Sequence, residues 1–208
     1  MARAWEQRKT SDARQQATVS LMDAAERLLY EVGYAGVTTR AVAEAAGVNH
    51  GLVHYYFGSM EVLLTRTLER FVEELALALE ALYADPNLTF AEKWRLGSQF
   101  WVDEPTSRFP KILLELLAMG WNMPELRAQL TEVHARFRGI FENHFGQALR
   151  EYGLDEAQFP LKVIVAAVTS FQLGLIVESL SGVDEGHQEL LDWIQRWIDE
   201  LEAKRTKR

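Results

Sequence analysis

The chain has 208 residues, of which 48% are apolar, and it contains no cysteine. This length and composition can build one large domain, or a small domain joined to a larger one, and they exclude disulfides, thiol nucleophiles and cysteine-based zinc sites. The net charge is −8, but residues 1–70 hold eight basic and eight acidic side chains, so the excess lies in the remaining residues. A neutral N-terminal part permits contact with nucleic acid without proving it.

The first segment, residues 1–13, is polar and charged, which predicts a flexible N-terminal arm and argues against a signal peptide. Its basic residues Arg3, Arg8 and Lys9, together with Arg14 and Trp5, can follow DNA phosphates or reach a minor groove, although a disordered tail is the simpler interpretation. No run of 18 uncharged apolar residues occurs, so we expect no membrane span and a cytoplasmic protein.

A helix is predicted from about Arg14 to Val32, and Gly33 ends it. Apolar residues recur there at helical steps on one face. They are Val19, Met22, Ala25, Leu29 and Val32.

Residues 38–57 read TTRAVAEAAGVNHGLVHYYF and predict two short helices joined by a tight turn. The threonine pair at the start can cap the first helix, and Asn49 can cap the second. Gly47 lies where the chain leaves the first helix with a positive φ, and Ala43 is small enough for the two helices to cross closely. This arrangement is typical of the helix-turn-helix that places a helix in the DNA major groove. An ordinary αα-hairpin with a glycine turn is the alternative.

The helical period separates two faces of this motif. The inward positions are Val42, Ala46, Val48, Val53 and Tyr56, and the outward positions are Arg40, Asn49, His50, Leu52, His54 and Tyr55. His50 and His54 are four residues apart, as metal-binding histidines can be, but Gly51 follows His50 and no carboxylate lies between them. Because both fall on the outward face, we predict contact with DNA and no metal.

A long helix is predicted over residues 59–84, with Ser59 as its cap and Asp85-Pro86 at its end. It would connect the helices of residues 14–58 to the rest of the chain. The remainder is predicted to be all-helical, over about residues 90–104, 107–122, 124–152, 156–180 and 184–204.

Large aromatic residues and a few polar ones in this remainder can line an apolar pocket for a small effector. For any one of them, ordinary core packing is the simpler explanation. The pocket candidates are Trp94, Gln99, Trp101, Trp121, His134, Phe137, Phe141, Phe171 and Gln172.

Two helices near the end, residues 161–180 and 190–201, are broadly apolar. A helix that is apolar on every side must be covered on every side, so we expect a dimer interface of two helices from each subunit. Burial inside one chain is the alternative. The interface candidates are Val168, Leu175, Ile176, Leu190, Ile194, Trp197 and Leu201.

The segment Val37–Leu64, VTTRAVAEAAGVNHGLVHYYFGSMEVLL, resembles the DNA-binding headpiece of the TetR family of bacterial regulators. The preceding A-x-x-L-x-x-x-x-G-Y pattern, from Ala25 to Tyr34, is similar to that family's first helix, and the likeness covers about residues 14–70. Met60 departs from the family, which usually has a phosphate-contacting lysine there. His54 stands where the family usually has tyrosine.

The resemblance implies an all-α fold, with a three-helix DNA-binding headpiece at residues 14–58 and a helical effector-binding and dimerisation domain at residues 59–208. It also implies a homodimer, a double-stranded DNA operator and a small-molecule effector as partners. The DNA-binding candidates are Thr38, Thr39, Arg40, Asn49, His50, Gly51, Leu52, His54, Tyr55 and Tyr56.

We therefore predict a DNA-binding transcriptional regulator, most simply a repressor that a small molecule releases from a palindromic operator. No phosphate-binding loop, nucleophile motif or paired acid/base carboxylates are evident, so we predict no enzymatic activity and no cofactor. The alternatives are a small-molecule-binding or enzymatic helical protein with a vestigial headpiece, and an activator on the same fold. Salt-dependent binding to duplex DNA would separate the regulators from the other class.

Overall fold

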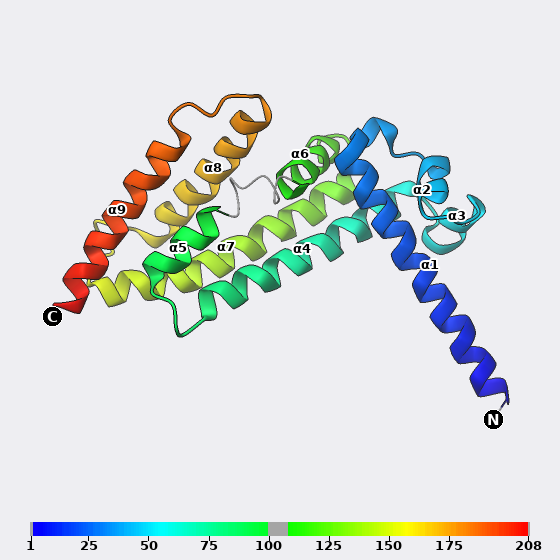
Figure 1. Cartoon of the computed structure of the whole chain (residues 1–208), viewed down its shortest axis with the longest axis horizontal. Coiled ribbons are helices and arrows are strands. Elements are labelled where there is room, and N and C mark those ends of the chain that lie inside the picture. Colours follow the sequence, from blue (N-terminus) through cyan, green and yellow to red (C-terminus); the bar gives the residue numbers. More distant parts are fainter. Residues whose placement is uncertain (1, 100–107, 208) are drawn as a thin grey trace. The chain divides into compact units, whose positions relative to one another are not determined.

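The computed structural model describes residues 2–99 and 108–207, with side chains from residue 13 onward apart from those of residues 108 and 109. Every regular element in this part of the chain is a helix, which confirms the predicted all-α fold (Figure 1). The elements are α1 (Ala2–Val32), the 3-10 helix η1 (Tyr34–Gly36), α2 (Thr39–Ala45), α3 (Gly51–Phe57), α4 (Met60–Ala84), α5 (Phe90–Gln99), α6 (Arg108–Gly120), α7 (Pro124–Tyr152), α8 (Leu161–Leu180) and α9 (His187–Thr206).

The helices form two compact units. The first unit comprises residues 1–72 and 112–129, and the second comprises residues 73–111 and 130–208. The first unit is larger than the headpiece expected at residues 14–58, because the first half of α4 and parts of α6 and α7 cluster with the N-terminal helices.

Helix α1 begins at Ala2, so the residues expected to form a flexible arm are helical in the structure. No glycine or proline interrupts residues 2–32, and alanine, arginine, glutamine, glutamate and lysine, which favour helix, predominate in the first part. The expectation of a flexible arm was based on the charge of this segment and did not take its helix propensity into account.

The core of the first unit is built around the fully buried Leu21 and Leu29 of α1, Val42 of α2, Val53 of α3 and Leu63 of α4. Two residues predicted for the inward face of α1 are exposed instead, Val19 by 44% and Val32 by 57%. Val19 lies outside the arc that Leu21 and Leu29 define, and Val32 is the last residue of the helix, where the chain turns away.

The second unit places α5 against α9, and residues of α4, α5, α7, α8 and α9 form its core. The second half of α4 and α7 meet through aromatic rings: Tyr83 packs edge-on against Phe141, with ring centroids 6.1 Å apart. The buried cluster consists of Ala76, Leu79, Tyr83, Ala91, Trp94, Ile140, Phe141, Phe145, Val165 and Ile198.

Helix α8 is long and apolar enough to cross a membrane by length and composition alone. It contains Lys162 and Glu178 near its two ends, so its uncharged run is shorter than 18 residues. Only 22% of its most apolar stretch is buried inside the chain. One such helix is also common in proteins that never enter a bilayer, so this feature shows that α8 needs a cover without identifying it as a membrane span.

Candidate functional site

The turn between α2 and α3 has the local geometry predicted from the sequence. The hydroxyl of Thr38 accepts a hydrogen bond from the Ala41 amide, with 3.1 Å between the two atoms, and so caps α2. Gly47 has φ of 67°, which only glycine adopts without strain. Asn49, predicted to cap α3, lies one residue before the observed N-cap, His50, and its side-chain oxygen accepts a hydrogen bond from the Gly51 amide at 2.9 Å.

The inward face of this motif is packed tightly at its centre. Val42 and Val53 are fully buried, and Ala43 is 2% exposed at the point where its small side chain allows close packing. Phe57, four residues after Val53, is also buried although it was not among the predicted inward positions. Ala46, Val48 and Tyr56 are half-buried.

Most of the predicted DNA-binding residues lie on the surface. Tyr55 is 72% exposed, a high value for an aromatic side chain, and its ring packs edge-on against Tyr56 with centroids 5.0 Å apart. Thr39, Arg40, His50 and His54 line an open hollow formed by the two helices. Thr38, Arg40, Asn49, His50, Gly51, His54 and Tyr55 are exposed, and Thr39, Leu52 and Tyr56 are half-buried.

The ring of His54 is held by its own helix end. Its Nδ1 lies 3.0 Å from the Gly58 carbonyl oxygen, which can only accept a hydrogen bond. We therefore assign the proton of the neutral imidazole to Nδ1, which leaves Nε2 as an acceptor. Neutral His54 can accept from a base amino group, and it can donate to a phosphate only when it is protonated.

Helix α1 supports this face with two arginines: Arg14, which was expected to contact DNA, and Arg27, for which the sequence predicted no role. The Arg14 guanidinium lies 5.9 Å from the centre of the Tyr56 ring, within range of a cation–π interaction. Arg27 donates to the Ala45 carbonyl at 2.9 Å and so satisfies an acceptor at the end of α2. Nothing in the local pattern around either arginine signals its partner.

Two charged contacts fasten α1 to later helices of the first unit. Arg70 of α4 binds Asp23 at 2.6 Å and Glu26 at 2.8 Å. Partial burial lowers the pKa of Arg70, but hydrogen bonds to the two carboxylates outweigh it and raise the pKa above its ordinary value. Glu115 of α6 accepts a hydrogen bond from the Tyr34 amide at 2.9 Å, just after α1 ends.

The part of the chain that carries this motif matches a family model. Residues 21–67, from α1 into α4, match the model described as bacterial regulatory proteins, tetR family. Two relatives from Pseudomonas putida, ArpR and TtgR, are named as HTH-type transcriptional regulators. They are 29% and 28% identical to this chain over 202 residues, and each alignment covers 92% of both chains.

The chain is a TetR-family regulator. The crystal structure of a TetR-family protein from Mesorhizobium loti MAFF303099 shares its fold, with a TM-score of 0.71 at 16% identity over 91% of this chain and 96% of that one. The family model and the two relatives identify a DNA-binding transcriptional regulator, as the sequence predicted. The relatives are named as regulators and not as enzymes.

The predicted pocket residues of this TetR-family regulator do not form one site. Trp94, Phe141 and Gln172 are buried, and Phe137 and Phe171 are half-buried. Gln99, His134 and Trp121 are exposed, and Trp101 lies outside the described residues. Trp121, at 76% exposure, belongs to the first unit, whereas Trp94 belongs to the second. The presence of an aromatic residue in the sequence does not show whether it lines a pocket or lies at an exposed helix end. The prediction that Trp121 lines the pocket is wrong.

An apolar cavity of about 140 Å³ does lie in the second unit, between α5, α7, α8 and α9. Trp94 is the one predicted pocket residue on its wall. Four residues predicted for the dimer interface line it as well: Val168, Ile194, Trp197 and Leu201.

The other interface candidates divide by burial. Leu175 and Ile176 are 6% and 3% exposed, so their own chain already covers them and the expectation that a partner does so is wrong. Leu190 and Trp197 are 38% and 41% exposed. Val163 and Trp193 were not named as candidates, yet each is 62% exposed. A helix that is apolar all round gives no sequence signal for which side faces inward.

Proposed function

We propose that the protein is a homodimeric repressor, and that its two headpieces, α1 to α3 of each chain, bind neighbouring major-groove half-sites of a palindromic operator. The observation that carries the proposal is the outward face of α2 and α3. Arg40, His50 and His54 gather there around one hollow beside the exposed Tyr55. Polar and aromatic groups on the outside of a rigid helix-turn-helix are what base and phosphate contacts require.

Individual roles follow from chemistry and placement. Arg40 is the fixed positive charge of the hollow and supports a phosphate or guanine contact. His54, with Nε2 as an acceptor, suits an adenine or cytosine amino group. Gly51 is exposed at the start of α3, where the lack of a side chain allows close approach. The remaining candidates are Thr38, Thr39, Asn49, His50, Leu52, Tyr55 and Tyr56.

The apolar cavity of the second unit supports an effector of matching chemistry. Its wall is built from aliphatic and aromatic side chains, and the Tyr152 hydroxyl among them donates to Glu202 at 2.8 Å. A cavity of roughly 150 Å³ accommodates one benzene-sized ring. An ionised compound would lose its hydration there without compensation. The effector we propose is therefore a small uncharged apolar molecule, or the apolar end of a larger one.

The exposed apolar surface of α8 and α9 supports dimerisation through these helices. Val163, Val177, Trp193 and Trp197 are between 41% and 62% exposed. Because Trp197 also lines the apolar cavity, an effector there would contact the same helix that we assign to the interface. Effector binding would then move α4 and change the spacing of the two headpieces, so that operator affinity would fall. By thermodynamic linkage, operator binding would lower the affinity for the effector by the same factor.

Selection of bound duplexes from a random-sequence pool tests this proposal. We expect the recovered sequences to share a palindrome whose half-sites are centred about 10 base pairs, or a multiple of that distance, apart. Recovery of asymmetric sequences, or of no shared sequence, would contradict a two-headpiece repressor and favour the vestigial-headpiece alternative. A reporter placed behind the selected operator distinguishes repression from activation.

A further inference from the structure

The second unit also contains a polar cleft of about 400 Å³, separate in its chemistry from the apolar cavity. It lies where the connection between α4 and α5 meets α7 and the end of α9. The side chains that give the cleft its character are Phe90, Lys93, His144, Gln147, Glu151 and Arg205.

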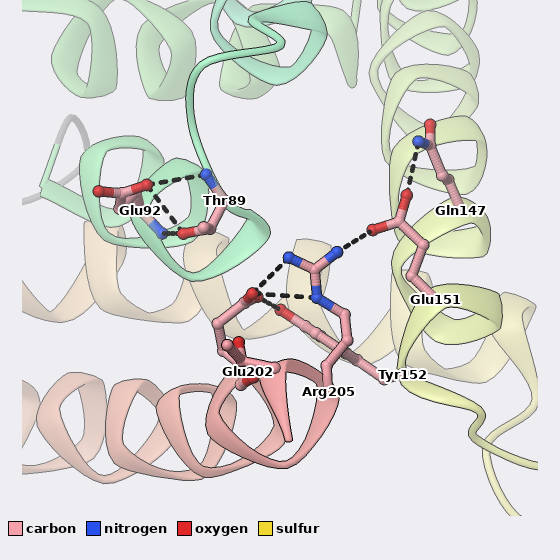
Figure 2. Close-up of polar contacts among 8 residues, drawn as sticks. Thr89, Glu92, Gln147, Glu151, Tyr152, Glu202 and Arg205 are labelled. Atoms are coloured by element: carbon pink, nitrogen blue, oxygen red, sulfur yellow. Dashed lines mark hydrogen bonds and ion pairs between the residues drawn. The ribbon is translucent and has the colours of Figure 1, made fainter. Parts of the chain in front are cut away.

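One wall of the cleft is already neutralised by internal contacts (Figure 2). Arg205 donates to Glu151 at 3.3 Å and to Glu202 at 2.5 Å and 3.0 Å. The second oxygen of Glu151 accepts from Gln147 at 2.8 Å. The Arg205 guanidinium and the Glu151 carboxylate therefore have partners, and this wall has little charge left to offer a ligand.

The cleft also contains the positive charge of Lys93 of α5, for which the described part of the chain supplies no ion-pair partner. The nearest carboxylate along its own helix, Glu92, is held by the amide and hydroxyl of Thr89 at 2.8 Å and 2.9 Å (Figure 2).

His144 of α7 stands beside this lysine in the cleft. Its ring stacks on the buried Tyr83 ring of α4, with centroids 5.4 Å apart and an angle of 25° between the planes. Burial lowers the pKa of His144, and the charge of Lys93 lowers it further, while the weaker influence of Glu80 on α4 raises it. Lys93 is therefore close enough to His144 for the two groups to interact electrostatically.

We propose that this cleft binds a small anion, a carboxylate or a phosphate, with its oxygens between the Lys93 ammonium and the His144 imidazole. Phe90 supplies an apolar surface beside them, which suits an anion with an organic body. The ammonium donates to one oxygen and the protonated imidazole to another. This site differs in chemistry from the apolar effector cavity, although Phe90 and Ala148 line both.

The proposal has a consequence for protons. A bound anion favours the charged imidazole, so binding raises the pKa of His144 and proceeds with proton uptake. Affinity therefore increases as the pH falls through the titration of His144. The groups that bear on this ring are Glu80 and Tyr83 of α4 and Lys93 of α5, and the paired Glu151 and Arg205 line the same cleft.

Histidine NMR of the full-length protein tests the site. The ring signal of His144 is identified by its loss in His144→Gln, and the wild type is titrated separately with benzoate and with inorganic phosphate. We expect a saturable shift of that signal and an increase of the His144 pKa with at least one probe. Saturation by benzoate alone assigns the site to carboxylates, and saturation by phosphate alone assigns it to phosphates. No saturable shift with either probe at millimolar concentration overturns the proposal.

Two lysine variants provide the matched comparison. Lys93→Met keeps the length of the side chain and removes its charge, and we expect it to weaken binding by about tenfold, the effect of one lost close ion contact. Lys162→Met makes the same change at an exposed position of α8 outside the cleft, and its affinity should equal that of the wild type. Equal affinities of the two variants would also overturn the proposal.

Discussion

The Glu115 carboxylate accepts a hydrogen bond from the Tyr34 amide at 2.9 Å, across 81 positions of sequence. This contact joins α6 to the junction between α1 and η1, directly before the helix-turn-helix. Gly33 makes the approach possible, since a Cβ at this residue would lie 2.9 Å from the other Glu115 oxygen. The position of the first helix therefore depends on a carboxylate that belongs to a much later part of the chain.

Gly33→Ala is expected to destabilise the first unit. Its φ of 70° disfavours alanine, and the added methyl group would displace Glu115 from the Tyr34 amide. We expect a loss of about 1–3 kcal/mol in the free energy of unfolding, measured by urea titration. Gly139→Ala is the control, because it adds a methyl group to a helical position with open space around it and should be neutral or slightly stabilising. Equal midpoints for both variants would contradict the role of Gly33.

Tyr55→Ala and His54→Ala are expected to weaken operator binding and leave the dimer intact. Both side chains are exposed on α3, so their loss removes DNA contacts without opening the core. Each should cost about 1–3 kcal/mol of binding free energy, measured by anisotropy with the selected operator. His134→Ala, an exposed histidine of α7, is the control and should bind as the wild type does. Wild-type affinity in both α3 variants would remove α3 from the DNA interface.

Restoring a lysine at position 60 is expected to strengthen DNA binding. Met60 is the first residue of α4, next to α3, and the family usually places a phosphate-contacting lysine there. One added phosphate contact should increase the slope of log affinity against log salt concentration by about 0.9. Affinities measured at several salt concentrations give this slope directly. An unchanged slope would show that position 60 does not reach the DNA.

Trp193→Asp is expected to break the dimer. Trp193 is 62% exposed on α9 and does not line the apolar cavity, so the substitution should act on the interface alone. Sedimentation at micromolar concentration should show a monomer. Trp121→Asp places the same change at a tryptophan of the first unit that is 76% exposed, and it should remain dimeric. A dimeric Trp193→Asp protein would refute the assignment of α9 to the interface.

The stability of the second unit is expected to depend on pH through His144. Burial, and then Lys93, hold the pKa of His144 below its ordinary value of 6.5, so the unfolded chain binds the proton more readily. The wild type should therefore lose stability as the pH falls below about 6.5, and His144→Gln should lose less. Melting temperatures of the two proteins between about pH 7.5 and about pH 5 test this. Parallel pH profiles would contradict it.

Local chemistry explains what could be predicted from the sequence. Thr38, Gly47 and Ser59 act on neighbours within a few residues, so their capping and turn roles are evident from spacing alone. The partners of Glu115 and Arg27 lie far away in sequence, and no periodic pattern indicates them. Likewise, the burial of Ile176 beside the exposed Val177 depends on which side of an all-apolar helix meets the core, and only packing decides this.

We expect the outward face of α2 and α3 to bind a specific operator. Fluorescence anisotropy with the DNA immediately upstream of the protein's own gene, against a shuffled duplex of the same length, tests it most directly. We predict tighter binding to the upstream duplex, with an affinity that falls more than tenfold between about 50 mM and about 200 mM salt as counterions are released. Equally weak binding to both duplexes would contradict this expectation if selection from the random-sequence pool also recovers no preferred sequence.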